Sequence, residues 1–386
     1  MTTTIALPPP PELAAPAAPA FRFVDLFAGI GGIRAGLEGA GGACVYTVEN
    51  DEHAVATYSA NWGEVPARDI RQVQPGDLPP HEVLAAGFPC QPFSLAGVSK
   101  KNHLKRLHGF DDPTSGNLFF EIIRLIGGSD EEATFQELYS DLEGDAEVAK
   151  FQKSAPASAA APPALLLENV RHLVSHDQRR TFRVVRRRLM ASGYRVNHAI
   201  INGASWVPQN RRRVIIVALR ADLFDSKFVF EEPEPDESHG PRLDDTVLAP
   251  DGDDLERYRL TEGVWNALKK HRAKHELKGN GFGYGIAKRG GVTRTLSARY
   301  YKDGAEILIE MPDGGRPRRL TPRECGNLMG FTRAELGFEF EIPVSNRQAY
   351  QQFGNSVVVP QFRWIGECLS AYAAPVLQKH MAEWPG

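Results

Sequence analysis

The sequence predicts an α/β protein with a mostly parallel sheet, helices on both faces of that sheet, and a second, smaller domain. Short apolar runs alternate with helical stretches over residues 21–220, which is typical of a sheet built from successive β–α units. A chain of 386 residues also exceeds what one compact core usually holds. An acidic, proline-rich stretch at residues 222–254 then marks the boundary between the two domains.

Each expected strand is a short, mostly apolar run, and most are followed by a helical pattern. The first run, FRFVDLF at residues 21–27, leads into the glycine-rich AGIGG and a helix that ends at Ala40. The expected strands are residues 21–27, 43–49, 82–86, 164–168, 214–219 and 306–310. The other expected helices are residues 52–61, 117–126, 179–192 and 261–275, with further helices from Pro322 onward.

Two segments do not follow this alternation. Residues 1–20 are rich in Thr, Ala and Pro and lack the basic and apolar regions of a secretory signal, so we expect a disordered leader. Residues 127–163 are first acidic and then rich in Ala, Ser and Pro, which indicates an insertion or a mobile loop. Deletion of residues 128–163 should be tolerated if they form only a loop.

The composition indicates a globular chain without membrane spans, disulfides or metal sites. Hydrophobic residues make up 42% and charged residues 24% of the chain, and no apolar run approaches the roughly 18 residues of a membrane helix. The four cysteines are widely spaced and show no metal-ligand pattern, so we expect free thiols and a cytoplasmic location. They are Cys44, Cys90, Cys325 and Cys368.

Charge is unevenly distributed along a chain whose formal net charge is −3. Residues 171–220 contain twelve arginines and one acidic residue, and residues 269–302 contain ten Lys or Arg and one acidic residue. This segregation suits a basic face that binds nucleic acid. It is equally compatible with solvated helix faces, and charge alone does not distinguish the two.

The glycine-rich segment after the first strand predicts a site for a nucleotide-like ligand. Glycines between a strand and a helix let a ligand approach the backbone at the carboxyl edge of the sheet. The pattern is not the dinucleotide fingerprint, because Arg34 occupies the place of its third glycine. Glu49 ends the second strand and can accept hydrogen bonds from ribose hydroxyls, and Asp69, after a probable third strand, can hold an adenine amino group. The alternative is a tight structural turn.

Cys90 is the candidate nucleophile. It lies between Pro89 and Pro92 in a loop that follows a buried strand, where the prolines stiffen the backbone. Most single cysteines are small core residues, and that interpretation holds for Cys44, Cys325 and Cys368. It is weaker for Cys90, because a loop between two prolines is a poor place to bury an apolar side chain.

Glu168 and the arginines of residues 209–213 are further candidates. A carboxylate at the end of a buried strand should have a raised pKa and can donate a proton near neutral pH, although Glu168 could also cap a following helix. Strand alternation places Arg211 and Arg213 on one face and Arg212 on the other, so one pair could point into the crevice. The alternative is an exposed basic loop.

These segments, in this order, resemble the motifs of the DNA cytosine-5 methyltransferase family over nearly the whole chain after Phe21. The matching segments are DLFAGIGG (residues 25–32), GFPCQPFS (87–94), ENV (168–170), QNRRR (209–213), RRLTPRECGNLMGF (318–331) and QFGNSVVVP (352–360). The resemblance implies a Rossmann-like methyltransferase domain at residues 21–220, with the insertion at 128–163. It also implies a target-recognition domain at 221–344 and C-terminal helices at 345–386 that return to the catalytic domain.

The resemblance also implies roles for individual residues. Cys90 would attack C6 of a flipped cytosine, Glu168 would protonate N3, and Arg211 and Arg213 would contact the base. S-adenosylmethionine would supply the methyl group, and no metal would be needed. The residues implied to contact this cofactor are Phe27, Ala28, Gly29, Ile30, Gly32, Glu49, Asn50, Asp69, Ile70, Pro89, Leu118, Asn355 and Val357.

Residues 279–286 and 293–310 resemble the Dcm/EcoRII group, whose targets are CCWGG, and relatives that act on CCNGG. The resemblance therefore implies methylation of the inner cytosine of such a site in double-stranded DNA, by a bacterial, nucleoid-associated monomer. A cognate restriction endonuclease is possible, because such methylases occur both with and without one. The residues expected to contact DNA are Gln91, Ser94, Arg294 and Arg299, and either arginine can read a guanine edge or anchor a phosphate.

Three other functions compete with this one. A tRNA cytosine-5 methyltransferase shares the catalytic motifs, but residues 279–310 resemble the DNA enzymes. A catalytically silent DNA-binding regulator is disfavoured by the presence of Cys90, Glu168 and Arg213 together. An NAD-linked oxidoreductase is disfavoured by Arg34 and by Cys90.

Overall fold

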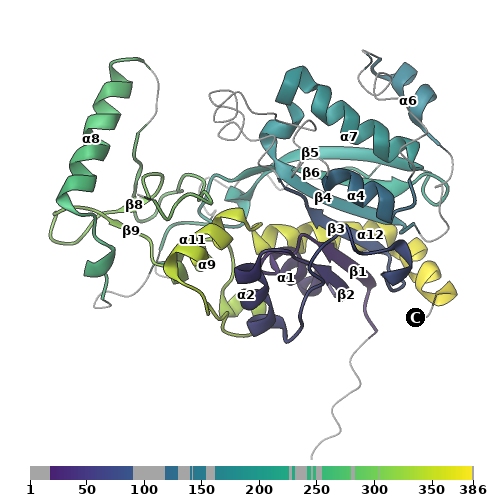
Figure 1. Ribbon diagram of the computed structural model, residues 1–386, viewed down its shortest axis with the longest axis horizontal. Helices are drawn as coiled ribbons and strands as arrows, with labels where there is room; N and C mark the ends of the chain where they lie inside the picture. Colours follow the sequence, from purple (N-terminus) through teal and green to yellow (C-terminus); the bar gives the residue numbers. More distant parts are fainter. Residues whose placement is uncertain are drawn as a thin grey trace, which may run out of the picture.

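The computed structural model describes residues 18–89, 118–128, 140, 142–153, 161–225, 228–230, 241–244, 247–248, 254–279, 283–302 and 304–384. The described chain forms a large lobe around a twisted sheet and a small lobe to one side of it (Figure 1). The small lobe comprises the described residues between 241 and 320. The predicted leader, at residues 1–20, lies almost entirely outside the described residues.

In the described part of the large lobe, a six-stranded sheet has the order β2-β1-β3-β4-β6-β5. Strand β1 pairs in parallel with β2 and β3, and β3 pairs in parallel with β4, whereas β6 runs antiparallel to both β4 and β5. The strands are β1 (Phe21–Leu26), β2 (Gly42–Val48), β3 (Val83–Gly87), β4 (Ala164–Val170), β5 (Tyr194–Asn202) and β6 (Arg212–Arg220). The predicted α/β fold class is confirmed.

Helices cover both faces of the sheet (Figure 1). Alternate residues of β3, β4 and β6 point to opposite faces, so these strands are apolar on both sides. The helices on one face are α1 (Gly32–Gly39) and α12 (Val359–Glu383), and those on the other are α4 (Leu118–Leu125), α6 (Asp145–Phe151) and α7 (Arg180–Ala191). Helix α2 (Glu52–Trp62) follows β2.

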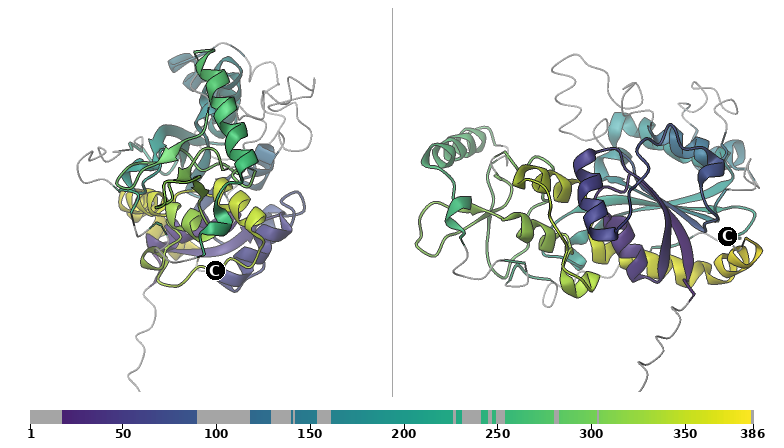
Figure 2. Two further views of the ribbon diagram at one scale, coloured as in Figure 1. Left: turned by 90° about the vertical axis from the view of Figure 1, so that its left-hand side faces the viewer. Right: turned by 60° about the horizontal axis from the view of Figure 1, so that its bottom comes forward.

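The small lobe projects from the end of the large lobe at which β6 begins (Figures 1 and 2). It contains the long helix α8 (Glu262–Glu276) and a three-stranded sheet of the two-residue strands β7 (Ile286–Ala287), β8 (Leu308–Ile309) and β9 (Arg318–Arg319). Three helices follow it and lead back to α12. They are α9 (Pro322–Leu328), α10 (Arg333–Leu336) and α11 (Asn346–Asn355). One apolar core is shared between the small lobe and these helices, with Leu296 and Tyr300 packed against Phe353 and Tyr350.

The structure departs from the expected elements in three places. Strand β5 was not predicted, because it is an edge strand in which Arg195, Asn197 and His198 interrupt the apolar pattern. No strand precedes Asp69, since the chain there forms only an isolated bridge between Val48 and Ala67. The expected strand at residues 306–310 is limited to β8.

The segment predicted as a mobile insertion contains helix α6, which is anchored to α7. Glu147 is 1% exposed and forms ion pairs with Arg186 and Arg187. Arg187 is fully buried and donates from Nη1 to the Ser140 carbonyl oxygen at 2.7 Å, and Phe151 joins the core of the large lobe. Residues 142–153 are therefore more than a loop, and deleting them would leave Arg187 without its carboxylate.

Candidate active site

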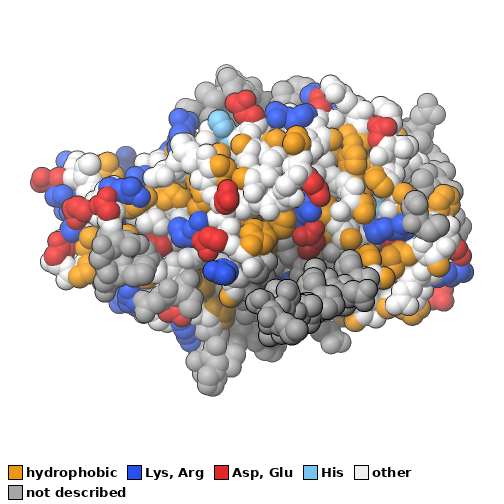
Figure 3. Space-filling model, turned by 90° about the horizontal axis from the view of Figure 1, so that it is seen from below, with side chains coloured by type: hydrophobic (Ala, Val, Ile, Leu, Met, Phe, Trp, Pro, Cys, Tyr) orange, Lys and Arg blue, Asp and Glu red, His pale blue; other side chains and the backbone are white. Residues whose placement is uncertain are grey.

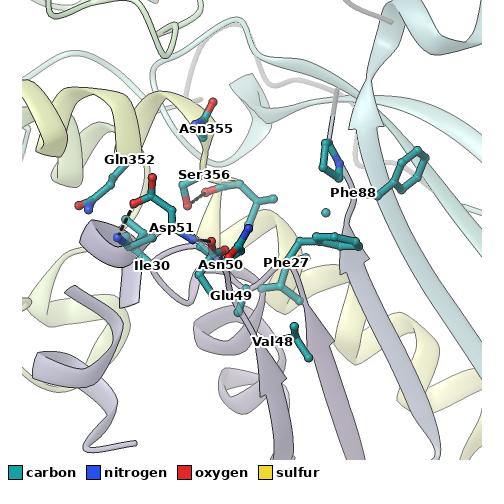
Figure 4. Close-up of a pocket in the computed structure, with 18 of the residues that line it drawn as sticks. Phe27, Ile30, Val48, Glu49, Asn50, Asp51, Phe88, Gln352, Asn355 and Ser356 are labelled. Atoms are coloured by element: carbon teal, nitrogen blue, oxygen red, sulfur yellow. Dashed lines mark hydrogen bonds between the residues drawn. The ribbon is translucent and has the colours of Figure 1, made fainter. Parts of the chain in front are cut away.

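A cavity of about 560 Å³ lies at the edge of the sheet where β1, β2, β3 and β4 end. Parallel strands bring their carboxyl ends to one edge, which places residues from distant motifs around the same space. Phe27 and Phe88 line one side (Figure 4). Gln352 and Asn355 of α11, with Ser356 directly after this helix, line another. Cavities of roughly 300–1,000 Å³ hold small-molecule ligands of cofactor size.

The turn between β1 and α1 is tight because several of its residues are in the left-handed region. Phe27 has φ 59°, Gly29 has φ 59° and Gly31 has φ 86°. Glycine adopts this conformation at little cost, whereas a phenylalanine there is strained. A Cβ at Gly31 would lie 2.1 Å from Nε1 of Trp62, so a side chain is also sterically excluded there. The turn exposes its backbone to the cavity, as the glycine-rich motif predicted.

Glu49 lies at the floor of the cavity, directly after β2 (Figure 4). Its Oε2 accepts a hydrogen bond from the Gly29 amide at 2.8 Å, and its Oε1 accepts one from the Asp51 amide at 2.7 Å. Burial raises the pKa of Glu49, and these backbone hydrogen bonds partly offset that effect. A carboxylate has lone pairs for about four hydrogen bonds, so Glu49 keeps capacity for ligand hydroxyls.

Asp69 lines the same cavity, but its carboxylate is held by a neighbour. Arg71 donates from Nε to Oδ1 at 2.9 Å and from Nη2 to Oδ2 at 2.8 Å. These hydrogen bonds lower the pKa of Asp69 below its ordinary value. Ile70 beside it is 4% exposed and provides apolar wall.

Glu168 lies near the carboxyl end of β4, lines the cavity and is 8% exposed. Its Oε1 lies 3.0 Å from Nε of Arg213, at the start of β6. Burial raises the pKa of Glu168, and this effect exceeds the opposing influence of Arg213 and Arg211. A carboxyl group with a raised pKa can be protonated near neutral pH, which suits a proton donor.

Asn169 fixes the turn that leads to Cys90, a role that the sequence did not indicate. Its side chain is fully buried and donates from Nδ2 to the Phe88 carbonyl oxygen at 3.0 Å. Its Oδ1 accepts from the Val170 amide at 2.9 Å. The only indication in the sequence was a polar residue directly after a predicted catalytic carboxylate, within a strand expected to be buried.

Cys90, Gln91 and Ser94 lie outside the described residues. The chain leading to Cys90 is described through Pro89, which lines the cavity. Gly87 at the end of β3 pairs with Glu168, and a Cβ at Gly87 would lie 3.8 Å from Oε2 of Glu168. Cys90 therefore follows, by three residues, a backbone position adjacent to the Glu168 carboxylate.

Arg211 does not line the cavity, contrary to the expectation that it would point into the crevice beside Arg213. It is 1% exposed and hydrogen-bonds to backbone carbonyls of Leu296, Gly354 and Ser356. The error has a simple cause: β6 begins at Arg212, so strand alternation does not extend back to Arg211.

Every residue that the resemblance assigns to the cofactor lines this one cavity. Gln352 and Ser356 line it as well and were not predicted, because they lie among small and amide residues without an obvious chemical role. Nε2 of Gln352 is buried and has no hydrogen-bond partner among the described residues. The cavity therefore presents the Glu49 carboxylate and apolar walls to a ligand.

The arginine-rich stretch at residues 171–220 does not form one exposed basic face. Arg187, Arg188 and Arg211 are buried, whereas Arg171, Arg179, Arg183 and Arg186 line a second cavity together with Glu143 and Glu147. On the face seen from below, basic and acidic side chains are interspersed (Figure 3). In the small lobe, Arg294 and Arg299 are exposed, and Arg294 donates from Nη1 to the Gly283 carbonyl oxygen at 2.7 Å.

Comparison with known proteins identifies the family. The model of the C-5 cytosine-specific DNA methylases matches residues 21–135 and 151–371. This chain belongs to that family. The DNA-cytosine methyltransferase of Escherichia coli strain K12 is 42% identical over 404 residues, which cover 91% of this chain and 77% of that protein. The type II methyltransferase M.NlaX of Neisseria lactamica is 39% identical over 361 residues, or 92% of this chain and 98% of the relative.

Solved structures support the fold of this methyltransferase. The S. pombe Dnmt2 methyltransferase superposes with a TM-score of 0.60 at 19% identity, covering 92% of this chain and 99% of its own. The Entamoeba histolytica methyltransferase EhMeth gives a TM-score of 0.61 at 17% identity, covering 91% and 98%. The large lobe is therefore the Rossmann-like fold of this family. Among the described residues, no helix has the length and apolar character needed to cross a bilayer.

Membership in this family makes the chain an enzyme that methylates DNA cytosine at C5, of the kind found in type II restriction-modification systems. Its cofactor is S-adenosylmethionine, and the cavity fits this molecule by the chemistry of its lining. Apolar residues such as Ile30, Ile70 and Phe88 suit an adenine ring, and the Glu49 carboxylate suits ribose hydroxyls.

Proposed function

We propose that this methyltransferase acts on the inner cytosine of CCWGG or CCNGG in duplex DNA, through a covalent bond between Cys90 and the flipped base. The observation that carries the proposal is the Glu168–Arg213 pair inside the cofactor cavity. It places a protonatable carboxyl and a fixed cation beside the strand end that leads to Cys90. A cytosine in this cavity would meet all three groups.

The cavity residues would hold the cofactor at the edge of the sheet. Glu49 would accept from the ribose hydroxyls, the turn at Phe27–Gly32 would lie along the ligand, and Asn355 and Val357 would close the pocket from the C-terminal side. Asp69 would contact the adenine amino group while keeping its bond to Arg71. S-adenosylmethionine would supply an electrophilic methyl group on a sulfonium ion.

Cytosine C5 is a weak nucleophile, and the protein residues would activate it. The Cys90 thiolate would add to C6 while Glu168 donates a proton to N3, which makes the ring enamine-like and nucleophilic at C5. Arg213 would hold Glu168 and hydrogen-bond to the base. Methyl transfer to C5 would leave S-adenosylhomocysteine. Loss of the C5 proton to solvent would then expel the Cys90 sulfur as a thiolate, and return of the N3 proton to Glu168 would restore neutral, aromatic 5-methylcytosine.

The position of Glu168 favours base flipping. Glu168 is 8% exposed within the cavity, so a cytosine stacked in a duplex could not bring N3 to its carboxyl group. Extruding the base costs a few kcal/mol, which contacts in the pocket would offset. The flipped base would be held between the Cys90 loop and Arg213.

Target selection is proposed for the small lobe. Arg294 and Arg299 are exposed there, within the segment that resembles enzymes acting on CCWGG and CCNGG. Either side chain could form the bidentate contact with guanine that is common in sequence-specific DNA recognition. Gln91 and Ser94, beside Cys90 in the sequence, would contact DNA near the flipped base. We further propose a monomer at the nucleoid, acting beside a cognate restriction endonuclease or without one.

Bisulfite sequencing tests the whole proposal. Plasmid DNA would be sequenced from cells that lack other cytosine methylases and express either this chain or its Cys90→Ser variant. We expect protection confined to the inner cytosine of CCWGG or CCNGG with the natural chain, and none with the variant. Protection of a different motif would overturn the target but not the chemistry. Methylation by the variant would overturn the covalent mechanism, and methylation only of RNA would overturn the substrate.

A further inference from the structure

Arg211 connects the small lobe to the wall of the cofactor cavity. Its guanidinium donates from Nη1 to the Leu296 carbonyl oxygen at 2.8 Å. From Nη2 it donates to the carbonyl oxygens of Gly354 at 2.9 Å and Ser356 at 2.5 Å. A planar guanidinium has five donors in fixed directions and can therefore bind two chain segments at once. Leu296 belongs to the segment proposed to meet DNA, whereas Gly354 and Ser356 line the cavity.

The small-lobe segment at residues 293–296 is hydrogen-bonded to the segment that contains Arg211. The Leu296 amide donates to Oε1 of Gln209 at 2.8 Å, and Nε2 of Gln209, which is fully buried, donates to the Leu328 carbonyl oxygen at 3.3 Å. The Thr293 amide donates to the Pro208 carbonyl oxygen at 2.8 Å, and the Asn210 amide donates to the Thr293 carbonyl oxygen at 2.9 Å. The segment from Thr293 to Leu296 is thus fixed to the segment from Pro208 to Arg211.

The cofactor end packs against the same small-lobe segment without space for a side chain. A Cβ at Gly354 would lie 2.4 Å from the Ala298 nitrogen and from the Ser297 carbonyl group. Only glycine allows the two backbones to approach this closely. On its other side, Ser356 packs against α1, because a Cβ at Gly32 would lie 2.6 Å from Oγ of Ser356. Displacement of the small-lobe segment would therefore move the cavity wall.

We propose that Arg211 is a positioning residue that couples cofactor binding to DNA binding. It lies two residues before Arg213 and bonds on one side to the cavity wall and on the other to the DNA-facing segment. This inference rests on the proposed function, because it requires DNA at the small lobe. When DNA fixes the segment from Thr293 to Ala298, the wall from Gly354 to Val357 is held in the cofactor-binding position. Coupling of this kind is reciprocal between the two ligands.

A merely structural arginine would lower stability without changing the coupling. Arg187 provides that comparison, since it is also buried and also donates to backbone carbonyls, but it joins α7 to the segment before α6. Lysine keeps the positive charge of either arginine and removes the two-sided donor geometry. Arg187 also pairs with the buried Glu147 carboxylate. The Arg187→Lys variant therefore controls for the loss of a buried guanidinium away from the cofactor cavity.

The experiment measures the dissociation constant of S-adenosylhomocysteine by calorimetry, with and without a CCWGG duplex. The ratio of the two constants is the coupling factor, and couplings of this type are typically about 5- to 150-fold. We expect tighter binding with DNA for the natural chain, a ratio near one for Arg211→Lys, and the natural ratio for Arg187→Lys. Should Arg211→Lys fail to fold, Thr295→Val, which removes the hydrogen bond from Thr295 Oγ1 to the Asn210 carbonyl oxygen, should lower the ratio partially.

The outcomes separate this proposal from the proposed function. A natural chain that methylates duplex DNA but shows no coupling would overturn the inference alone. So would a folded Arg211→Lys variant, or failing that Thr295→Val, that keeps the natural ratio. Loss of the ratio in Arg187→Lys to the same extent would show a general effect of buried arginines. A natural chain that methylates no duplex DNA would instead overturn the proposed function.

Discussion

Two buried glutamates lie at opposite ends of neighbouring strands in the same sheet, and their surroundings shift their pKa values in opposite directions. Glu168, at the carboxyl end of β4, has one ion-pair partner among the described residues, Arg213, and burial raises its pKa. Glu82 precedes β3 at the other edge and is fully buried. Burial would raise its pKa too, but hydrogen bonds from His380 and from Arg22 outweigh burial and lower it to about 2.

The two carboxylates differ in how many hydrogen bonds they accept. Oε2 of Glu82 accepts from the backbone amide and Nε of Arg22 at 2.8 and 3.1 Å, and Oε1 accepts from Nη2 of Arg22 at 2.7 Å. Nδ1 of His380 on α12 lies 3.0 Å from Oε1 of Glu82. A carboxylate bound on all sides stabilises the fold, whereas one left with spare capacity can exchange a proton with a substrate.

The largest expected effect is on catalysis by Glu168→Gln. Without the carboxyl proton, N3 of cytosine would not be protonated, and the single-turnover methylation rate should fall by about 10²- to 10⁴-fold. S-adenosylhomocysteine affinity should be unchanged. Thermal stability should fall less than in Glu82→Gln, because Glu168 has one ion-pair partner among the described residues and its burial disfavours the charged form. A variant with near-natural rates would remove Glu168 from the chemistry.

Whether the role of a residue could be predicted from the sequence depends on how far along the chain its partners lie. Glu49 and Glu168 were found because each ends a buried strand, and parallel strands bring such positions to one edge. The role of Arg211 was not, because its partners Leu296 and Gly354 lie 85 and 143 residues away. Glu82 and His380 are 298 residues apart, and neither belongs to a motif. Local motifs thus predicted residues that line one cavity, whereas long-range polar contacts required the structure.

Strand β5 shows a second limit. Its neighbour β6 is buried on both faces and apolar from Val214 to Leu219, so its sequence predicts a central strand. As the edge strand, β5 is mostly half-buried or exposed, and it carries Arg195 and Asn197 where a central strand would carry valine. Its pairing with β6 determines the strand, and that pairing is not encoded locally.

The matched substitution at the other edge, Glu82→Gln, should affect stability and leave the methylation rate per folded molecule unchanged. Removing one partner of a buried ion pair costs about 3–5 kcal/mol, because the remaining charge stays buried. Since the pKa of Glu82 is lowered from 4.5 to about 2, its contribution is present above pH 4.5 and is lost as the pH falls towards 2.

Chemical denaturation of both proteins between neutral and acidic pH measures this effect. The difference in unfolding free energy between the natural chain and Glu82→Gln should shrink as the pH falls from 4.5 towards 2. Glu168→Gln serves as the matched control and should lack this trend. If Glu82→Gln instead lost catalysis at full stability, the assignment of chemistry to one edge and stability to the other would be wrong.

The smallest expected effect is a displacement of the pH profile by Arg213→Gln. Arg213 lowers the pKa of Glu168 through its charge and its hydrogen bond, although burial still dominates. Removing it should raise that pKa further, because a nearby opposite charge that favours the carboxylate is lost. Methylation requires protonated Glu168 in this mechanism, so the rate should decline at higher pH in the variant than in the natural chain.

The test compares the pH at which the rate declines. It does not compare the maximal rate, because Arg213 is also proposed to bind the base and its loss would lower that rate as well. Single-turnover rates at saturating DNA would be compared from acidic to alkaline pH, with Arg212→Gln as control. Arg212 precedes Arg213 at the start of β6 but is exposed. A decline at the same pH in all three proteins would mean that Glu168 does not act as the acid. In that case Arg213 would hold the Glu168 carboxylate in its charged form, as Arg22 holds that of Glu82.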